Sequence, residues 1–183
     1  MIMKIIFKSL IVLILIFNPV HSADNNQLDK LFEKLLEDGE ISARETEMKI
    51  WSIWTTHPTD QNLTSLLSRG TSFMNSQDYQ KAEDIFTTVI GLDPKWAEAW
   101  NKRATVLYLM GKYKKSQDDI DEVLKLEDRH FGALSGQGLV QMKLKNYEKA
   151  LSSYERVKKI YPSMRSPKIM IPQIKEMIKD QSV

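Results

Sequence analysis

The apolar residues of this chain recur every three or four positions from residue 27 onward, which is the spacing of one face of a helix. Over residues 63–164 the pattern also repeats with a period of 34 residues, and three windows align without gaps: 63–96, 97–130 and 131–164. Each window holds two apolar runs, so each predicts a pair of antiparallel helices. Repeated pairs of this kind predict an all-α protein.

Short polar turns separate the two runs of each window. They are Gln77-Asp78, Gly111-Lys112 and Lys145-Asn146. Pro94 and Pro162 close the first and third windows, because proline cannot continue a helix. The chain therefore predicts three helical hairpins in succession.

Matching side chains at three positions of the repeat are expected to pack the two helices of a hairpin together. The eighth position is tiny, the seventeenth is tyrosine and the twentieth is small: Gly70, Ala104 and Gly138; Tyr79, Tyr113 and Tyr147; Ala82, Ser116 and Ala150. Glycine inside a helix costs about 1 kcal/mol relative to alanine, so mid-helix glycines indicate close approach. We expect the tiny residue to face the small one, with Phe86, Ile120 or Tyr154 beside them. Ser116 is expected to bond to a backbone carbonyl of the preceding turn.

These three consecutive units resemble the tetratricopeptide repeat family. The resemblance implies a right-handed superhelical solenoid of helix-turn-helix hairpins, in which the first helices line a concave groove that binds peptides or partner surfaces. Carrying the groove over by position gives eleven candidate contact residues: Thr64, Leu67, Thr71, Met74, Asn101, Lys102, Thr105, Tyr108, Ser135, Leu139 and Met142.

Some members of the family grip a terminal carboxylate with basic and amide side chains at set groove positions. Here those positions hold Leu67 and Thr71 in the first unit and Gly132 and Gly136 in the third. Asn101 and Lys102 are the polar groups that remain, so we expect a neutral protein or peptide segment with apolar anchors. A methionine or tyrosine at helical spacing is more often buried packing, and that interpretation stays open for each groove residue.

The flanks predict capping helices, because each unit of a solenoid covers only its neighbours. Residues 24–62 predict an N-terminal helical hairpin, with one helix over 27–37 and a second running from a Ser42–Glu45 capping box to about Trp54. Residues 165–183 predict a C-terminal capping helix. Pro172 either kinks that helix or marks its start.

Residues 1–22 have the pattern of a secretory signal peptide. Lys4 and Lys8 precede an apolar run from Leu10 to Phe17, and a cleavage site follows between Ser22 and Ala23. The run is shorter than the ~20 apolar residues that a membrane span needs. We predict export, most simply to the periplasm, with a membrane-anchored protein retaining the uncleaved signal as the alternative.

The amino-acid composition excludes several kinds of site and gives no support for others. The 183 residues include no cysteine, which excludes disulfides, thiolate metal centres, thiol catalysis and cysteine-linked lipid anchors. The balance of 26 basic and 24 acidic residues gives no support for nucleic-acid binding. His57 and His130 lack partners at metal-ligand spacing, and we expect both to be solvated or junction residues. The four tryptophans are expected to pack between helices: Trp51, Trp54, Trp96 and Trp100.

We therefore predict an exported adaptor or scaffold that binds protein through its groove, without metal, cofactor or catalysis. Self-assembly through an incompletely capped end is the structural alternative, as an accessory component of an envelope complex or a homo-oligomer. An unrecognised enzyme is the third hypothesis, for which Glu98 is the acidic candidate among the groove positions.

Overall fold

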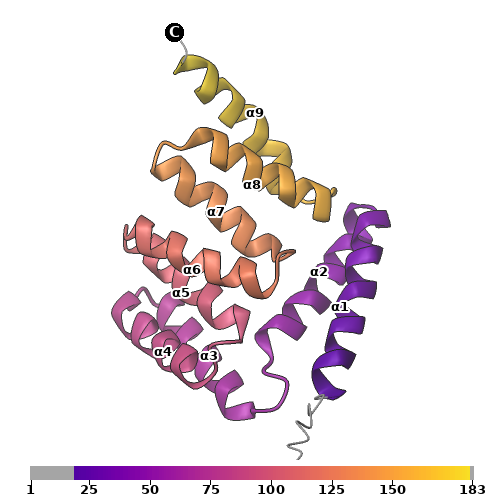
Figure 1. The fold of residues 1–183 in the computed structure, drawn as a ribbon, viewed down its shortest axis with the longest axis vertical. Helices are drawn as coiled ribbons and strands as arrows, with labels where there is room; N and C mark the ends of the chain where they lie inside the picture. The colour runs from indigo at the N-terminus through magenta and orange to yellow at the C-terminus, as the bar shows by residue number, and fades with distance from the viewer. Residues whose placement is uncertain (1–18, 182–183) are drawn as a thin grey trace, which may run out of the picture.

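The computed structural model describes residues 19–181, with side chains from residue 26 onward. Within this range the secondary structure is entirely helical, and nine helices follow one another (Figure 1): α1 (Pro19–Glu37), α2 (Glu40–Thr55), α3 (Gln61–Asn75), α4 (Tyr79–Leu92), α5 (Ala97–Leu109), α6 (Tyr113–Leu126), α7 (Phe131–Lys143), α8 (Tyr147–Ile160) and α9 (Arg165–Asp180). Residues 1–18 of the predicted signal peptide lie outside the described residues. The predicted cleavage bond falls within α1.

The three predicted hairpins are present as α3–α4, α5–α6 and α7–α8, stacked side by side (Figure 1). The prediction of an all-α repeat solenoid is confirmed. Gln77, Gly111 and Lys145 occupy the same position of the three turns, and all three have a left-handed backbone, with φ of 63°, 74° and 61°. This conformation reverses the chain within two residues and sets the second helix antiparallel to the first.

Glycines bring the helices of the first and third hairpins together. A Cβ atom on Gly70 would lie 2.5 Å from the Phe86 ring, and one on Gly138 would lie 2.4 Å from the Tyr154 ring. The aromatic residue itself therefore covers each glycine, where we expected the small residue four positions earlier. In the second hairpin the equivalent positions hold Ala104 and the smaller Ile120, which share one buried cluster.

The small and tyrosine positions of the repeat also lie in the hairpin cores. Ala82, Ser116 and Ala150 are buried, and the three tyrosines are the first residues of α4, α6 and α8: Tyr79, Tyr113 and Tyr147. The expected partner of Ser116 was wrong. Its hydroxyl donates to the Ala104 carbonyl of α5, across the hairpin, at 2.8 Å.

The N-terminal hairpin α1–α2 forms, but its position differs from the predicted cap on the first unit. It packs along α8 and the start of α5, at the edge where second helices end and first helices begin (Figure 1). Leu35 and Ile50 share one buried cluster with Phe131 and Val157 of the third unit. The large apolar side chains of the hairpin find a matching aromatic surface there, so the hairpin joins the second and third units.

The start of α2 also corrects the sequence analysis. The helix begins at Glu40 with Gly39 at the N-cap, and no side chain caps it. The Ser42 hydroxyl donates to the Gly39 carbonyl at 3.2 Å. The proposed Ser42–Glu45 capping box therefore does not form, because Ser42 already lies inside the first turn.

Helix α9 closes the other end of the solenoid against α8, with Ile174 fully buried. It begins at Arg165, 34 residues after the first residue of α7, and Pro172 lies within it. Pro172 is therefore not the start of the helix.

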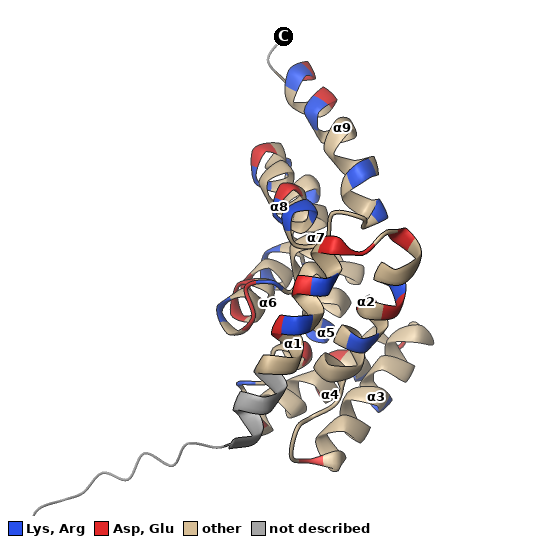
Figure 2. Cartoon of the chain, turned by 90° about the vertical axis from the view of Figure 1, so that its right-hand side faces the viewer, with Lys and Arg blue, Asp and Glu red and all other residues tan. Residues whose placement is uncertain are grey.

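Two positions of α9 are polar where the first unit has apolar residues. Lys168 and Lys175 hold the repeat positions of Leu66 and Phe73, and both lysines are exposed. Figure 2 shows more Lys and Arg than Asp and Glu along this helix. A polar outer face is what a terminal helix of a solenoid needs. Among the described helices, none combines the length and apolar character required to cross a bilayer.

Candidate functional site

The concave side holds a hollow of about 210 Å³ between α5 and α7, backed by α6. It contains five of the predicted groove residues, Asn101, Thr105, Tyr108, Ser135 and Leu139, and its remaining lining is small or apolar: Ala104, Ser116, Ile120, Gly132, Ala133 and Gly136. We call it the groove pocket. Each lining side chain is uncharged at neutral pH, so the pocket offers a neutral, largely apolar surface.

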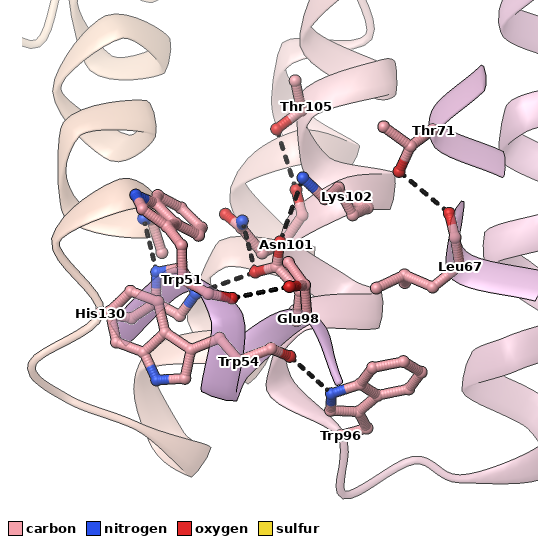
Figure 3. A network of polar contacts seen from close by, with 12 residues as sticks. Trp51, Trp54, Leu67, Thr71, Trp96, Glu98, Asn101, Lys102, Thr105 and His130 are labelled. Carbon is pink, nitrogen blue, oxygen red and sulfur yellow. Dashed lines mark hydrogen bonds and ion pairs between the residues drawn. The ribbon is translucent and has the colours of Figure 1, made fainter. Parts of the chain in front are cut away.

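A second hollow of about 320 Å³ lies between the end of α2, helix α3 and Lys102. It contains Thr64, Leu67, Thr71 and Lys102 of the predicted groove, together with Thr55, Thr56 and Ser68. The Thr71 hydroxyl donates to the Leu67 carbonyl of its own helix at 2.9 Å (Figure 3). That hydroxyl is therefore already engaged as a donor.

The two predicted groove methionines lie in neither hollow. Met74 packs against the core of the first hairpin, and Met142 packs with Tyr154 and Ile174 beneath α9. For these two methionines, the observed contacts are therefore those of core packing.

Trp51 of α2 contacts one lining residue of each hollow. Its ring lies against Gly132, where an added Cβ atom would come within 2.6 Å of the indole. The Lys102 ammonium lies 5.8 Å from the centre of the same ring. The Trp51 ring thus contacts α5 through Lys102 and α7 through Gly132.

A buried carboxylate lies beneath Trp51 and Trp54 (Figure 3). Glu98 is 1% exposed, and one of its oxygens accepts hydrogen bonds from Asn101 Nδ2 at 2.9 Å and His130 Nε2 at 3.1 Å. The Lys102 ammonium lies 3.2 Å from the other oxygen. Asn101 and Lys102, expected to grip a partner, are therefore directed to Glu98.

The electrostatics of this cluster favour an ionised Glu98. Burial raises the pKa of its carboxyl, but the hydrogen bond from His130 acts in the opposite direction. Lys102 and Asn101 add to that effect, and the pKa of Glu98 lies below its ordinary value. The carboxylate is thus a structural anion under the hairpin. Glu98 is no acid of the groove, which removes the candidate for the enzyme hypothesis.

Both histidines are buried at junctions between helix pairs, so of the two expected settings, solvated or at a junction, the structure shows the second. His130 Nδ1 accepts the Ala133 N–H at 3.1 Å, which places the ring hydrogen on Nε2 toward Glu98, and the ring stacks on Trp54 at 3.9 Å. His57 Nε2 lies 2.9 Å from an Asp93 oxygen. In the described part of the chain no three His, Asp or Glu side chains gather as a metal site would need.

The expected packing of the tryptophans is seen in their contacts. Trp54 lies 4.9 Å from the Phe131 ring, and Trp96 Nε1 donates to the Trp54 carbonyl at 2.8 Å. These contacts fasten α2 to the starts of α5 and α7. Sequence reasoning missed this docking, although Gly132 was a signal, since a glycine in a helix indicates that something approaches closely.

Comparison with known proteins agrees with the repeat pattern. The sequence matches the profile of the tetratricopeptide repeat over residues 67–115 and 102–165, which together span more than half of the chain. The chain belongs to the tetratricopeptide repeat family. The profile covers the three hairpins from α3 to the end of α8, so the family assignment rests on the part that forms the groove.

The chain matches part of two longer proteins. A TPR repeat-containing protein of Rhizobium etli is 40% identical over 97 residues, covering 53% of this chain and 48% of the relative. A DnaJ homolog subfamily C member 7 homolog of Dictyostelium discoideum is 26% identical over 106 residues, covering 56% of this chain and 20% of the relative. The chain thus spans about half, or less, of these relatives.

Solved tetratricopeptide structures share the fold. The TPR domain of Sgt2 from Aspergillus fumigatus superposes with a TM-score of 0.64 at 21% identity, covering 67% of this chain and 83% of that one. The first TPR domain of Spaghetti, solved with the HSP90 peptide SRMEEVD, superposes with a TM-score of 0.63 at 22% identity, covering 65% and 94%. At this identity the likeness establishes the fold.

Proposed function

We propose that this tetratricopeptide protein is an adaptor that binds a segment of another protein in the groove pocket and performs no catalysis. The observation that carries the proposal is the pocket itself, an uncharged hollow of about 210 Å³ on the concave side of a preordered scaffold. A rigid groove loses little entropy on binding, which favours recognition of a flexible segment.

The partner segment is neutral and anchors one large apolar side chain. The pocket has apolar walls, and the Ser135 hydroxyl among its lining residues has no hydrogen-bond partner within the described residues. The Spaghetti domain was solved with a peptide that ends in acidic residues. Here the nearby cation, Lys102, is paired with Glu98, which disfavours that class of ligand.

The protein acts outside the cytoplasm, most simply in the periplasm. The support is the sequence of residues 1–22, with its two lysines, apolar run and cleavage pattern. N-terminal sequencing of the protein from fractionated cells tests this. A mature chain beginning at Ala23 is expected, and a chain recovered from the cytoplasm with Met1 intact would contradict export.

A pair of matched variants tests the groove. Gly136→Leu adds a side chain inside the pocket, where a Cβ atom would make an ordinary 3.7 Å contact with Ile120. Gly91→Leu adds the same side chain at an exposed site on α4 with nothing within 4 Å of its Cβ. Partners are captured by crosslinking in the native cell fraction and compared between the two variants.

The expected result is loss of the captured partner by Gly136→Leu and its retention by Gly91→Leu, with equal helical circular dichroism. Retention by both variants would show that binding does not use the pocket. Loss by both would place the partner elsewhere on the surface.

A further inference from the structure

The convex side holds another hollow, of about 320 Å³, between α6 and α8. Its lining comes from α6, α7 and α8 and consists of polar residues: Gln117, Asp121, Gln137, Gln141, Lys149, Ser152, Ser153 and Arg156. We call it the convex hollow. It lies on the opposite side of the first helices from the groove pocket, and it shares no residue with that pocket.

The same place one repeat earlier is filled by an ion pair. Arg103 donates two hydrogen bonds of 2.8 Å to the Asp119 carboxylate and one of 3.2 Å to Thr87. The residues 34 positions later are Gln137 and Ser153. A shorter neutral pair thus replaces a long guanidinium and its carboxylate, and this replacement leaves the space open.

Hydrogen bonds hold the floor of the convex hollow in place. Gln141 is 5% exposed, and it donates to the Gln117 carbonyl oxygen at 2.6 Å and accepts from Asn146 at 2.8 Å. The buried Ser153 hydroxyl lies 2.8 Å from the Lys149 backbone carbonyl oxygen and 2.9 Å from the Gln137 side-chain oxygen, and its one hydrogen is shared between them. The oxygens of Gln117, Gln137 and Gln141 are therefore used within the floor, while the amide N–H groups of Gln137 keep no partner among the described residues.

Two cations stand at the rim, seven residues apart on one side of α8. Lys149 forms no ion pair within the described residues, and Arg156 bonds to the Asp128 backbone carbonyl at 3.1 Å. The rim carboxylate, Asp121, already accepts a 2.8 Å hydrogen bond from Gln117. The hollow thus has an excess of positive charge and of unused N–H donors.

From this arrangement we propose that the convex hollow binds a small anionic group, a carboxylate or a phosphate. Lys149 and Arg156 hold the charge, since charge-assisted hydrogen bonds to a carboxylate or phosphate are stronger than neutral ones. The Gln137 amide donates from the floor. The group belongs either to a free small molecule or to an acidic side chain of a partner protein, and both present the same oxygens.

The test titrates the full chain with inorganic phosphate, with succinate and with a short peptide containing glutamates, each at constant ionic strength. Amide chemical shifts are followed by NMR. Saturable shifts are expected at residues of the convex hollow. Saturation by phosphate or succinate identifies a free small anion, whereas saturation by the peptide only identifies a protein side chain. If none of the three saturates, the proposal is wrong.

Three variants make the test specific. Lys149→Gln with Arg156→Gln should weaken binding by about tenfold or more, which is at least ~1.4 kcal/mol. Lys158→Gln removes an exposed cation of the same helix outside the hollow and should leave binding unchanged.

The third variant, Gln137→Arg with Ser153→Asp, rebuilds the ion pair of the preceding unit. It should abolish binding while the melting temperature stays the same or rises. Shifts that survive in this filled variant, or that sodium chloride reproduces, indicate an adventitious ion only and overturn the proposal.

Discussion

At the scale of single residues, two facing side chains in each hairpin, one from each helix, together fill a similar volume. The first and third units combine glycine with phenylalanine or tyrosine, and the second combines Ala104 with Ile120. A glycine in these helices is therefore not a defect. The missing side chain leaves room for the aromatic ring of the second helix. In the second unit, an alanine and an isoleucine fill the same volume instead.

Gly70→Ala should destabilise the protein, because the new Cβ would lie 2.5 Å from the Phe86 ring. Overpacking of this kind costs about 1–3 kcal/mol. The double variant Gly70→Ala with Phe86→Ile reproduces the second unit and should recover most of the loss. Urea denaturation measures both free energies of unfolding, and a double variant no more stable than the single one would contradict the exchange of volume.

A glycine without a close neighbour provides the control. Gly136→Ala places its Cβ 3.7 Å from Ile120, at ordinary contact distance. It should raise stability by about 0.5–1 kcal/mol, since alanine favours the helix.

Glu98 should make the free energy of unfolding depend on pH in the acid range. Its pKa lies below the ordinary value of 4.5, so its contribution is present above that pH and is lost as the pH falls toward the lower value in the folded protein. Glu98→Gln should cost about 2 kcal/mol at neutral pH, as expected for hydrogen bonds to a buried charge. The difference from the unmodified protein should shrink as the pH falls below 4.5.

Urea denaturation over a pH series measures this difference. The exposed Glu155 supplies the control, because Glu155→Gln should change neither the stability nor its pH profile. A constant difference for Glu98→Gln across the acid range would show that the carboxylate is not ionised in the folded protein.

At the scale of elements, the turns of the three hairpins share one backbone conformation but not one residue. The left-handed φ occurs at Gln77, Gly111 and Lys145, and a side chain in that region costs about 1 kcal/mol or more. The backbone is therefore strained in the turns that contain Gln77 and Lys145, and it is unstrained in the turn that contains Gly111.

Gln77→Gly and Lys145→Gly should each stabilise the protein by about 0.5–1 kcal/mol, and Gly111→Ala should destabilise it by a similar amount. Thermal unfolding followed by circular dichroism measures all three. A lower melting temperature for both glycine variants would mean that contacts of the Gln77 and Lys145 side chains outweigh the strain.

The elements themselves could be predicted from the sequence, because helical periodicity and a 34-residue repeat are local patterns. The docking of α1–α2 could not be. The apolar faces of that hairpin fit any large apolar surface, and the choice of the Phe131–Tyr161 edge depends on three-dimensional shape. The same limit applies to Asn101 and Lys102, whose positions in the groove follow from the repeat but whose partner, Glu98, becomes visible only with the hairpin in place.

At the scale of the whole molecule, the N-terminal hairpin fixes the groove by joining the second and third units. Arg129 bonds to Asp29 of α1 at 2.7 Å and lies 4.4 Å from the Phe32 ring, while Trp54 stacks on His130. The groove pocket is lined by α5, α6 and α7 of the family repeat. Helix α2 packs beside it, through the contact of Trp51 with Gly132.

Gly132→Ala should loosen this docking, because its Cβ would come within 2.6 Å of Trp51. Hydrogen exchange should accelerate in α2 while α3 and α4 keep their protection. Trp51→Ala in the same chain removes the clash and should restore part of the protection. Uniform acceleration over all helices would instead show that the hairpin and the solenoid unfold as one unit.

The most direct measurement of the central claim is calorimetric titration of peptides. A peptide selected from a random library on the folded protein is compared with SRMEEVD, the peptide of the Spaghetti complex. The groove pocket predicts a neutral selected peptide with a large apolar anchor, binding that weakens about tenfold or more in Gly136→Leu, and no saturable binding of SRMEEVD. Selection of acidic tails, or affinity unchanged by Gly136→Leu, would contradict the account.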